Sequence, residues 1–279
     1  MDKPRLGHIN FINCLPLDWG LTEGGLGAGL EIRPAVPATL NSLMVSGELD
    51  VSPVSSIVYA QNPDKLLILP NLSISAPGAL QSIVVVAKRP LADLGGRPVA
   101  LTAKSATSHG LLKIILGKAY GVEPEYSVSS LSLADGVLDG ADAALFIGDD
   151  ALFAYHNRRS GLLYYDLGDE WRKLTGGAMV YALWVADRGF AARRPDLLQL
   201  AYDKVRDGFR YGLTHLEAAA AARAGATPLT AEQVVRYIGL LDYRLDEARR
   251  QALTNYYRLA ADRGLIPAVP TLAFAAVKP

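Results

Sequence analysis

Short apolar runs alternate with stretches of helical spacing along the first third of the chain. The runs predict strands over residues 5–10, 30–36, 51–56, 66–69 and 72–75. Between the second and third runs, Pro37 is a typical first residue of a helix, and Gly47 is a typical residue after its end. Strands that alternate with helices in this way indicate an α/β fold.

Two longer apolar runs, residues 81–87 and 179–186, are typical of fully buried strands. A segment rich in Gly, Pro and charged residues, 88–98, follows the first run, and we interpret it as a crossing between two lobes. The second run is the expected return crossing. The pattern predicts one lobe made of residues 1–86 plus 184–279 and an inserted lobe made of residues 87–183.

Residues 47–56 and 140–150 share one pattern, in which a glycine, an aspartate, an apolar strand and two small polar residues follow a short helix. The helices of the inserted lobe are predicted over residues 108–120 and 131–138. The chain therefore contains two similar α/β units, without enough identity to be called a sequence repeat.

The chain after Pro195 is expected to be helical. Thr230 and Gln233 have the spacing of a capping box, and Asp246 is placed to cap a further helix that ends at Gly264. Two lobes joined by two crossings form a hinge, and a ligand is expected in the cleft where the strands of open parallel sheets end.

Composition narrows the range of partners. Twenty-eight Lys and Arg balance 28 Asp and Glu, so no overall field attracts nucleic acid or an acidic membrane. Cys14 is the only cysteine, which excludes an intrachain disulfide and a cysteine-based metal site and suits a reducing compartment. The first residues lack a signal-peptide pattern, and no apolar run approaches 18 residues, so we expect a cytoplasmic, soluble protein without an obligate protein partner.

Polar side chains at the ends of predicted strands are the candidates for chemistry. Asn13 lies just beyond the first strand, where its amide can donate to and accept from a ligand or only satisfy the loop backbone. His8 has a suitable pKa for a general base, but a hydrogen-bonded core histidine is the stronger interpretation, as it is for His109, His156 and His215. Ser55, Ser56 and Ser82 also stand at strand boundaries.

Three further groups of residues are candidates for binding. Ser105, Thr107 and Ser108 precede or begin a predicted helix, whose free N–H groups are suited to a carboxylate, with ordinary helix capping as the alternative. Asp149 and Asp150 follow Ile147 and Gly148 and serve as acid and base, as metal ligands or as helix caps, the last being favoured. Thr175 and Gly176 can meet a ligand, whereas Trp171 is expected to pack.

Several known motifs are absent from the sequence. It has no Gly-x-Ser-x-Gly elbow, Walker pattern or His-x-x-x-His pair, and its glycine-rich segment at 24–29 does not directly follow a strand. We therefore predict no metal, no nucleotide and no covalent acyl chemistry.

The opening segment 7–17, Gly-His-Ile-Asn-Phe-Ile-Asn-Cys-Leu-Pro-Leu, resembles the N-terminal signature of the chorismate dehydratases of the futalosine route to menaquinone. The segments 53–56, 105–108, 147–149 and 171–176 also resemble that family, in the same order, so the resemblance covers almost the whole chain. It implies a type II periplasmic-binding-protein fold and conversion of chorismate, without a cofactor, to 3-[(1-carboxyvinyl)oxy]benzoate and water. The polar pair of the family falls on Asn13 and Ser82, and the match is firmer at Asn13.

Two other functions stay open at this point. The fold serves mainly to bind solutes, so a small-molecule receptor is one alternative. The related dihydroxynaphthoate synthase shares the fold and the pathway, although its opening signature differs from Phe11 to Leu15.

Overall fold

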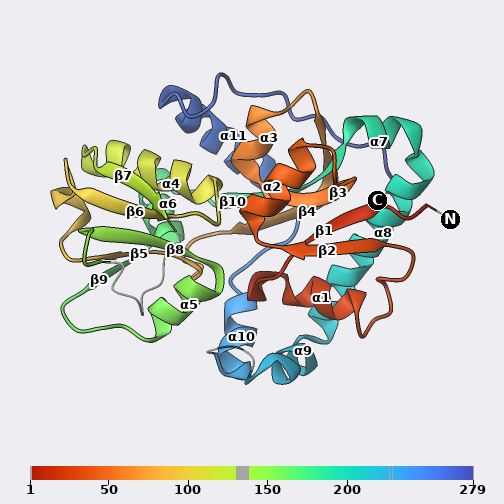
Figure 1. The fold of residues 1–279 in the computed structure, drawn as a ribbon, viewed down its shortest axis with the longest axis horizontal. Coiled ribbons are helices and arrows are strands. Elements are labelled where there is room, and N and C mark those ends of the chain that lie inside the picture. Colours follow the sequence, from red (N-terminus) through yellow and green to blue (C-terminus); the bar gives the residue numbers. More distant parts are fainter. Residues whose placement is uncertain (1, 130–137, 226, 228, 279) are drawn as a thin grey trace.

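The structure, a computed structural model, contains two five-stranded sheets side by side (Figure 1). It describes residues 2–129, 138–225, 227 and 229–278. The first sheet has the order β2-β1-β3-β10-β4. Its strands are β1 (Arg5–Ile9), β2 (Glu31–Ala35), β3 (Val51–Ser55), β4 (Leu66–Ala76) and β10 (Met179–Asp187).

The second sheet repeats the plan of the first, with the order β7-β6-β8-β5-β9. Its strands are β5 (Ile83–Ala87), β6 (Pro98–Thr102), β7 (Glu125–Ser129), β8 (Ala143–Ile147) and β9 (Leu163–Asp166). In each sheet the strand that arrives from the other lobe, β10 or β5, runs antiparallel to the strand beside it, β3 or β8. The α/β class and the two similar units predicted from the sequence are confirmed.

Both crossings lie earlier in the chain than the sequence indicated. β5 pairs with β8 and β9, so residues 83–87 belong to the second sheet and the first crossing is the segment 77–82. β10 pairs with β3 and β4 from Met179 onward, which places the return crossing just before it. The expected boundaries at 86–87 and 183–184 therefore need correction, because an apolar run shows that a strand is buried but not which sheet it joins.

Helices cover both sheets (Figure 1). The lobe of the second sheet carries η2 (Leu91–Asp93), α4 (Thr107–Ile115), η3 (Leu116–Tyr120), α5 (Gly148–His156) and α6 (Leu167–Thr175). The first lobe carries η1 (Ile12–Cys14), α1 (Leu15–Leu21), α2 (Pro37–Val45), α3 (Ser56–Gln61), α7 (Arg188–Arg193), α8 (Pro195–Thr214), α9 (Leu216–Arg223), α10 (Ala231–Ile238) and α11 (Glu247–Asp262). The capping box of Thr230 and Gln233 is present, and Asp246 caps α11.

Some elements differ from the prediction. The two short strands expected at 66–69 and 72–75 form one strand, β4, and residues 116–120 wind as a π-helix instead of continuing α4. The chain after α11 is not helical, and Phe274 bridges to Ile68 of β4. The helix expected at 131–138 falls almost wholly outside the described residues.

The sequence pattern missed η1 and α1, which lie where a glycine-rich connection was expected. α1 packs unusually close to α8. An added Cβ on Gly20 would lie only 2.3 Å from the carbonyl oxygen of Gly208, so only glycine fits there. Likewise, an added Cβ on Gly212 would lie 1.7 Å from the carbonyl oxygen of Pro16. These glycines fix the position of α1 and, through it, of η1, which carries Asn13.

We expect Gly212→Ala to lower the free energy of unfolding by about 1–2 kcal/mol, because an overpacking cost of up to about 3 kcal/mol against backbone outweighs the gain of about 1 kcal/mol in helix propensity. Thermal unfolding of the purified variant measures this change. Gly177→Ala is the control, since its added Cβ meets only a side-chain oxygen at 3.8 Å. A Gly212→Ala variant as stable as the unchanged protein would contradict the packing argument.

Candidate functional site

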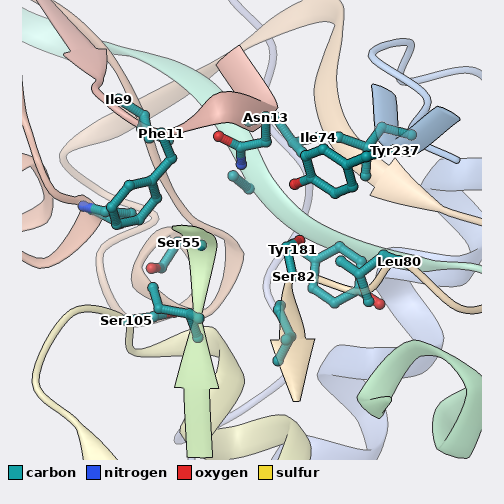
Figure 2. A pocket seen from close by; sticks show the side chains of 16 residues that line it. Ile9, Phe11, Asn13, Ser55, Ile74, Leu80, Ser82, Ser105, Tyr181 and Tyr237 are labelled. Carbon is teal, nitrogen blue, oxygen red and sulfur yellow. The ribbon is translucent and has the colours of Figure 1, made fainter. Parts of the chain in front are cut away.

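A cavity lies between the two sheets, at the ends of strands from both lobes (Figure 2). Its wall is mainly apolar with a few hydroxyl and amide groups, and none of the described residues that line it carries a charge. The lining residues are Ile9, Phe11, Asn13, Pro37, Ser55, Ile74, Leu80, Ser82, Ile83, Ser105, Ile147, Gly148, Tyr181, Ala182, Tyr237 and Leu241. The cavity volume is about 60 Å³, room for a few water molecules.

Asn13 is held by contacts from both lobes. The hydroxyl of Tyr243 donates to the Asn13 carbonyl oxygen at 2.7 Å, and the backbone N–H of Ile12 donates to Oδ1 of Asp149 at 3.0 Å. These bonds fix η1 and leave the Asn13 side chain directed into the cavity (Figure 2). Its Oδ1 is buried and, among the described residues, has no hydrogen-bond partner.

Ser82 reaches the cavity because the first crossing is anchored on both sides of it. The carboxylate of Asp166 accepts hydrogen bonds from the backbone N–H groups of Leu80 and Gln81. Gly148 N–H donates to the Ser82 carbonyl oxygen at 2.8 Å. Gln81 takes a left-handed conformation, with φ of 64°, which turns the chain sharply into β5. The buried Ser82 hydroxyl is thereby presented to the same space as Asn13.

Four helices present their N-terminal ends to the cavity. Pro37 is in the first turn of α2, Ser55 is the N-cap of α3, Ser105 lies just before α4, and Gly148 begins α5. Each helix N-terminus carries a partial positive charge of about half an elementary charge and unsatisfied N–H groups. A neutral cavity surrounded by helix N-termini is suited to bind an anion.

Gly148 is required by the close approach of Phe11. It has φ of 60°, and an added Cβ would lie 2.8 Å from the Phe11 ring. Ser105, Ile147 and Gly148 line the cavity.

Ser56, Thr107 and Ser108 do not line the cavity. The Ser56 hydroxyl donates to the carbonyl oxygen of Val180 at 2.8 Å, and Oγ1 of Thr107 accepts from the N–H of Ile57 at 3.3 Å. Both side chains are buried where α3 meets α4, so they join the lobes. Ser108 is fully buried, and its hydroxyl has no partner among the described residues.

The remaining candidates also have structural roles. Asp149 accepts from Ile12, and burial raises the pKa of its carboxyl, while Asp150 forms an ion pair with Lys104. The Thr175 hydroxyl donates to the carbonyl oxygen of Trp171 at 2.9 Å, and Gly176 ends α6 with φ of 72°. Neither Thr175 nor Gly176 lines the cavity. Trp171 packs in the core as predicted.

No histidine lines the cavity in the described part of the chain. His8 is buried beside Asp18, with 3.3 Å between Nε2 and Oδ1, and Nε2 of His109 lies 2.7 Å from the carbonyl oxygen of Thr102. Among the described residues, no group of three or more His, Cys, Asp or Glu side chains is arranged to hold a metal ion.

Sequence reasoning missed two tyrosines, Tyr181 of β10 and Tyr237 of α10. Both are buried, and both line the cavity. Tyr237 follows Val234 by three residues on the inward face of its helix, a position typical of core packing. Apolar periodicity alone therefore gave no sign that its hydroxyl meets the cavity.

His156 links the two lobes near the first crossing. Its Nε2 lies 3.2 Å from Oε1 of Gln81, and its Nδ1 lies 3.4 Å from Nε2 of Gln233 on α10. Oε1 of Gln233 already accepts from Thr230, so its amide nitrogen is the group that meets His156. A neutral imidazole with the proton on Nε2 satisfies both contacts, whereas a protonated ring would place its Nδ1–H against the N–H of the Gln233 amide.

This bridge predicts a pH dependence of stability. Burial, followed by Arg158 and Arg236, lowers the pKa of His156 below 6.5, so the unfolded chain takes up a proton before the folded one. Stability should therefore fall as the pH drops from about 6.5 towards the folded pKa. We expect the unfolding temperature of the unchanged protein to fall more between pH 7 and pH 5.5 than that of His156→Gln, which does not titrate. Parallel curves would contradict the bridge.

The sequence model of the family described as menaquinone biosynthesis matches residues 4–262. This chain belongs to that family. It is 33% identical to a chorismate dehydratase of Thermus thermophilus over 265 residues, which cover 90% of this chain and 93% of the relative. It is 28% identical to a 1,4-dihydroxy-6-naphtoate synthase of the same organism, with coverage of 98% and 100%.

The fold is that of the periplasmic binding proteins. The structure superposes on the periplasmic aliphatic sulphonate binding protein SsuA of Escherichia coli with a TM-score of 0.65 and 15% identity, over 98% of this chain and 96% of SsuA. At that identity the likeness concerns the fold alone. Of the helices in the described part of this family member, none has the length and apolar character needed to cross a bilayer.

Proposed function

We propose that this protein is a chorismate dehydratase, a carbon–oxygen lyase that converts chorismate to 3-[(1-carboxyvinyl)oxy]benzoate and water. One observation carries the proposal. Asn13 and Ser82, far apart in sequence, face the same neutral cavity in a member of the menaquinone biosynthesis family. The greater identity to the dehydratase than to the naphthoate synthase favours this function over the related one.

The reaction needs little from the protein. Chorismate loses a ring hydroxyl and the hydrogen on the neighbouring ether-bearing carbon, and the ring becomes aromatic, so much of the driving force lies in the substrate. Asn13 and Ser82 orient the leaving hydroxyl and the enolpyruvyl side chain by hydrogen bonding. Because the lining residues in the described part of the chain include no carboxylate, lysine or histidine, the enolpyruvyl carboxylate of the substrate is the proposed acceptor of the ring proton.

The electrostatics of the cavity suit a substrate with two carboxylates. Helix ends around the cavity offer partial positive charge and N–H groups that do not titrate near neutral pH. Ser105, just before α4, places one such end in the wall. We propose that the N-terminus of α4 holds one carboxylate of chorismate.

Mass spectrometry of purified protein mixed with chorismate tests this function directly. The expected result is loss of chorismate and formation of a benzoate one water lighter, at a rate well above that of chorismate alone. Binding of chorismate without turnover would indicate a receptor instead. If the protein neither binds nor converts chorismate, the naphthoate synthase becomes the favoured function. That function would then be tested with the substrate of that enzyme.

We expect Asn13→Ala and Ser82→Ala each to lower kcat by about 10²–10³-fold, because each removes a preorganised hydrogen-bonding group next to the reacting atoms. Chorismate binding, measured by calorimetry, should weaken much less. Ser42→Ala on the exposed face of α2 is the control. Near-normal turnover in both cavity variants would remove both residues from the mechanism.

Asp149→Asn distinguishes a substrate base from a protein base. An asparagine oxygen can still accept from Ile12 N–H, so η1 should keep its position. If the substrate carboxylate takes the proton, kcat should change by less than about 5-fold, a small effect beside that expected for a lost base. Loss of turnover with intact binding would instead identify Asp149 as the base.

We also propose that the protein acts in the cytoplasm. A single buried cysteine and a biosynthetic reaction support that compartment. Detection of activity in the soluble cell fraction after removal of periplasmic contents would test it.

A further inference from the structure

The hydroxyl of Tyr237 is buried in the cavity wall, with the Ser82 hydroxyl as its neighbour. The side chain is 0% exposed, and its oxygen has no hydrogen bond of regular geometry among the described residues. α10, which carries Tyr237, packs against η1, which carries Asn13. Figure 2 shows the Tyr237 hydroxyl pointing towards the Asn13 amide, across the space above Ser82.

A buried hydroxyl without a partner costs about 1–3 kcal/mol, and folded proteins contain few of them. A second buried polar atom, the amide oxygen Oδ1 of Asn13, also points into this cavity and has no hydrogen-bond partner among the described residues. Tyr181 has an unpartnered hydroxyl as well, but Figure 2 shows it pointing away from Asn13. Two unpartnered polar groups facing one space indicate that a ligand satisfies them.

Tyr237 is available as a hydrogen-bond donor. Burial raises the pKa of its hydroxyl far above the usual value, and hydrogen bonding with the nearby Ser82 hydroxyl only partly opposes this rise, so the group keeps its proton near neutral pH. The Asn13 amide provides both a donor and an acceptor. A hydroxyl on the ligand both accepts and donates, so it can satisfy Tyr237 and Asn13 together.

We infer that Tyr237 donates a hydrogen bond to the ring hydroxyl of chorismate that leaves as water. This inference rests on the proposed function. As the C–O bond breaks, negative charge grows on the departing oxygen, and the C–H electron pair becomes part of the aromatic ring. The proton taken from that carbon by the substrate carboxylate ends on the departing oxygen, so Tyr237 keeps its own proton and stabilises the charge.

Tyr237→Phe removes only the oxygen and keeps the ring. The variant should unfold at the same temperature as the unchanged protein or slightly above it, because the lost hydroxyl had no partner. Its kcat/KM for chorismate should fall by about 10–100-fold, mainly through kcat. Tyr126→Phe is the matched control, since Tyr126 also has a buried hydroxyl without a partner but does not line the cavity.

The product supplies a second readout, because it lacks the ring hydroxyl. Inhibition of Tyr237→Phe by 3-[(1-carboxyvinyl)oxy]benzoate should stay within about 3-fold of the unchanged protein, whereas a general loss of binding energy would weaken both ligands. Three results would each overturn this inference and leave the proposed function intact. They are equal weakening of both ligands, an unchanged kcat/KM, and loss of activity together with stability. Absence of chorismate turnover by the unchanged protein would overturn the proposed function itself, and with it this inference.

Discussion

The carboxylate of Asp166 is the point on which the arrangement of the two lobes depends. It accepts backbone hydrogen bonds from Leu80 and Gln81 in the first crossing and from Gly168 and Asp169 at the start of α6. Burial raises the pKa of this group, and the four N–H donors oppose that shift by stabilising the charged form. One half-buried carboxylate therefore holds the crossing and caps the helix that leads to the return strand.

The position of the cavity follows from that anchor. The crossing continues directly into Ser82 and β5, and Gly148 N–H then joins the Ser82 carbonyl to the start of α5. On the opposite wall, Asp149 and Tyr243 hold η1 so that Asn13 faces Ser82. The carboxylates of Asp149 and Asp166 accept hydrogen bonds from backbone N–H groups, and Asp150 pairs with Lys104, while neutral groups line the cavity. This division suits a reaction in which the substrate supplies the charges and most of the driving force.

Much of the fold could be predicted because it depends on periodicity. The α/β alternation, the two similar units and the caps at Thr230 and Asp246 follow from local patterns in the sequence. The sheet that residues 83–87 join could not be predicted, because it depends on pairing between β5 and β8, strands distant in the chain. η1 and α1 were missed because contacts between distant parts of the chain hold them in place. Gly20 of α1 packs against α8, and Gly212 of α8 packs against α1, and local sequence patterns do not show such contacts.

The candidate site divides in the same way. Asn13, Ser82, Ser105 and Gly148 lie at the ends of strands or next to helix starts, positions that the topology directs to the cleft. Hydroxyls such as those of Ser56 and Thr107 stand at similar places in the sequence but turn to the contact between the lobes, because rotation about a single bond decides the direction. Tyr237 resembles a core residue from its spacing, and only its unpartnered oxygen distinguishes it.

The central claim is that a neutral cavity between the lobes binds chorismate through hydrogen bonds and helix ends. A crystal structure of the Ser82→Ala variant with chorismate would test it most directly. The account predicts that the ring hydroxyl lies within hydrogen-bond distance of Asn13 and that one carboxylate lies at the N-terminus of α4. Chorismate bound outside this cavity, or held inside it by a lysine or arginine side chain, would contradict the account.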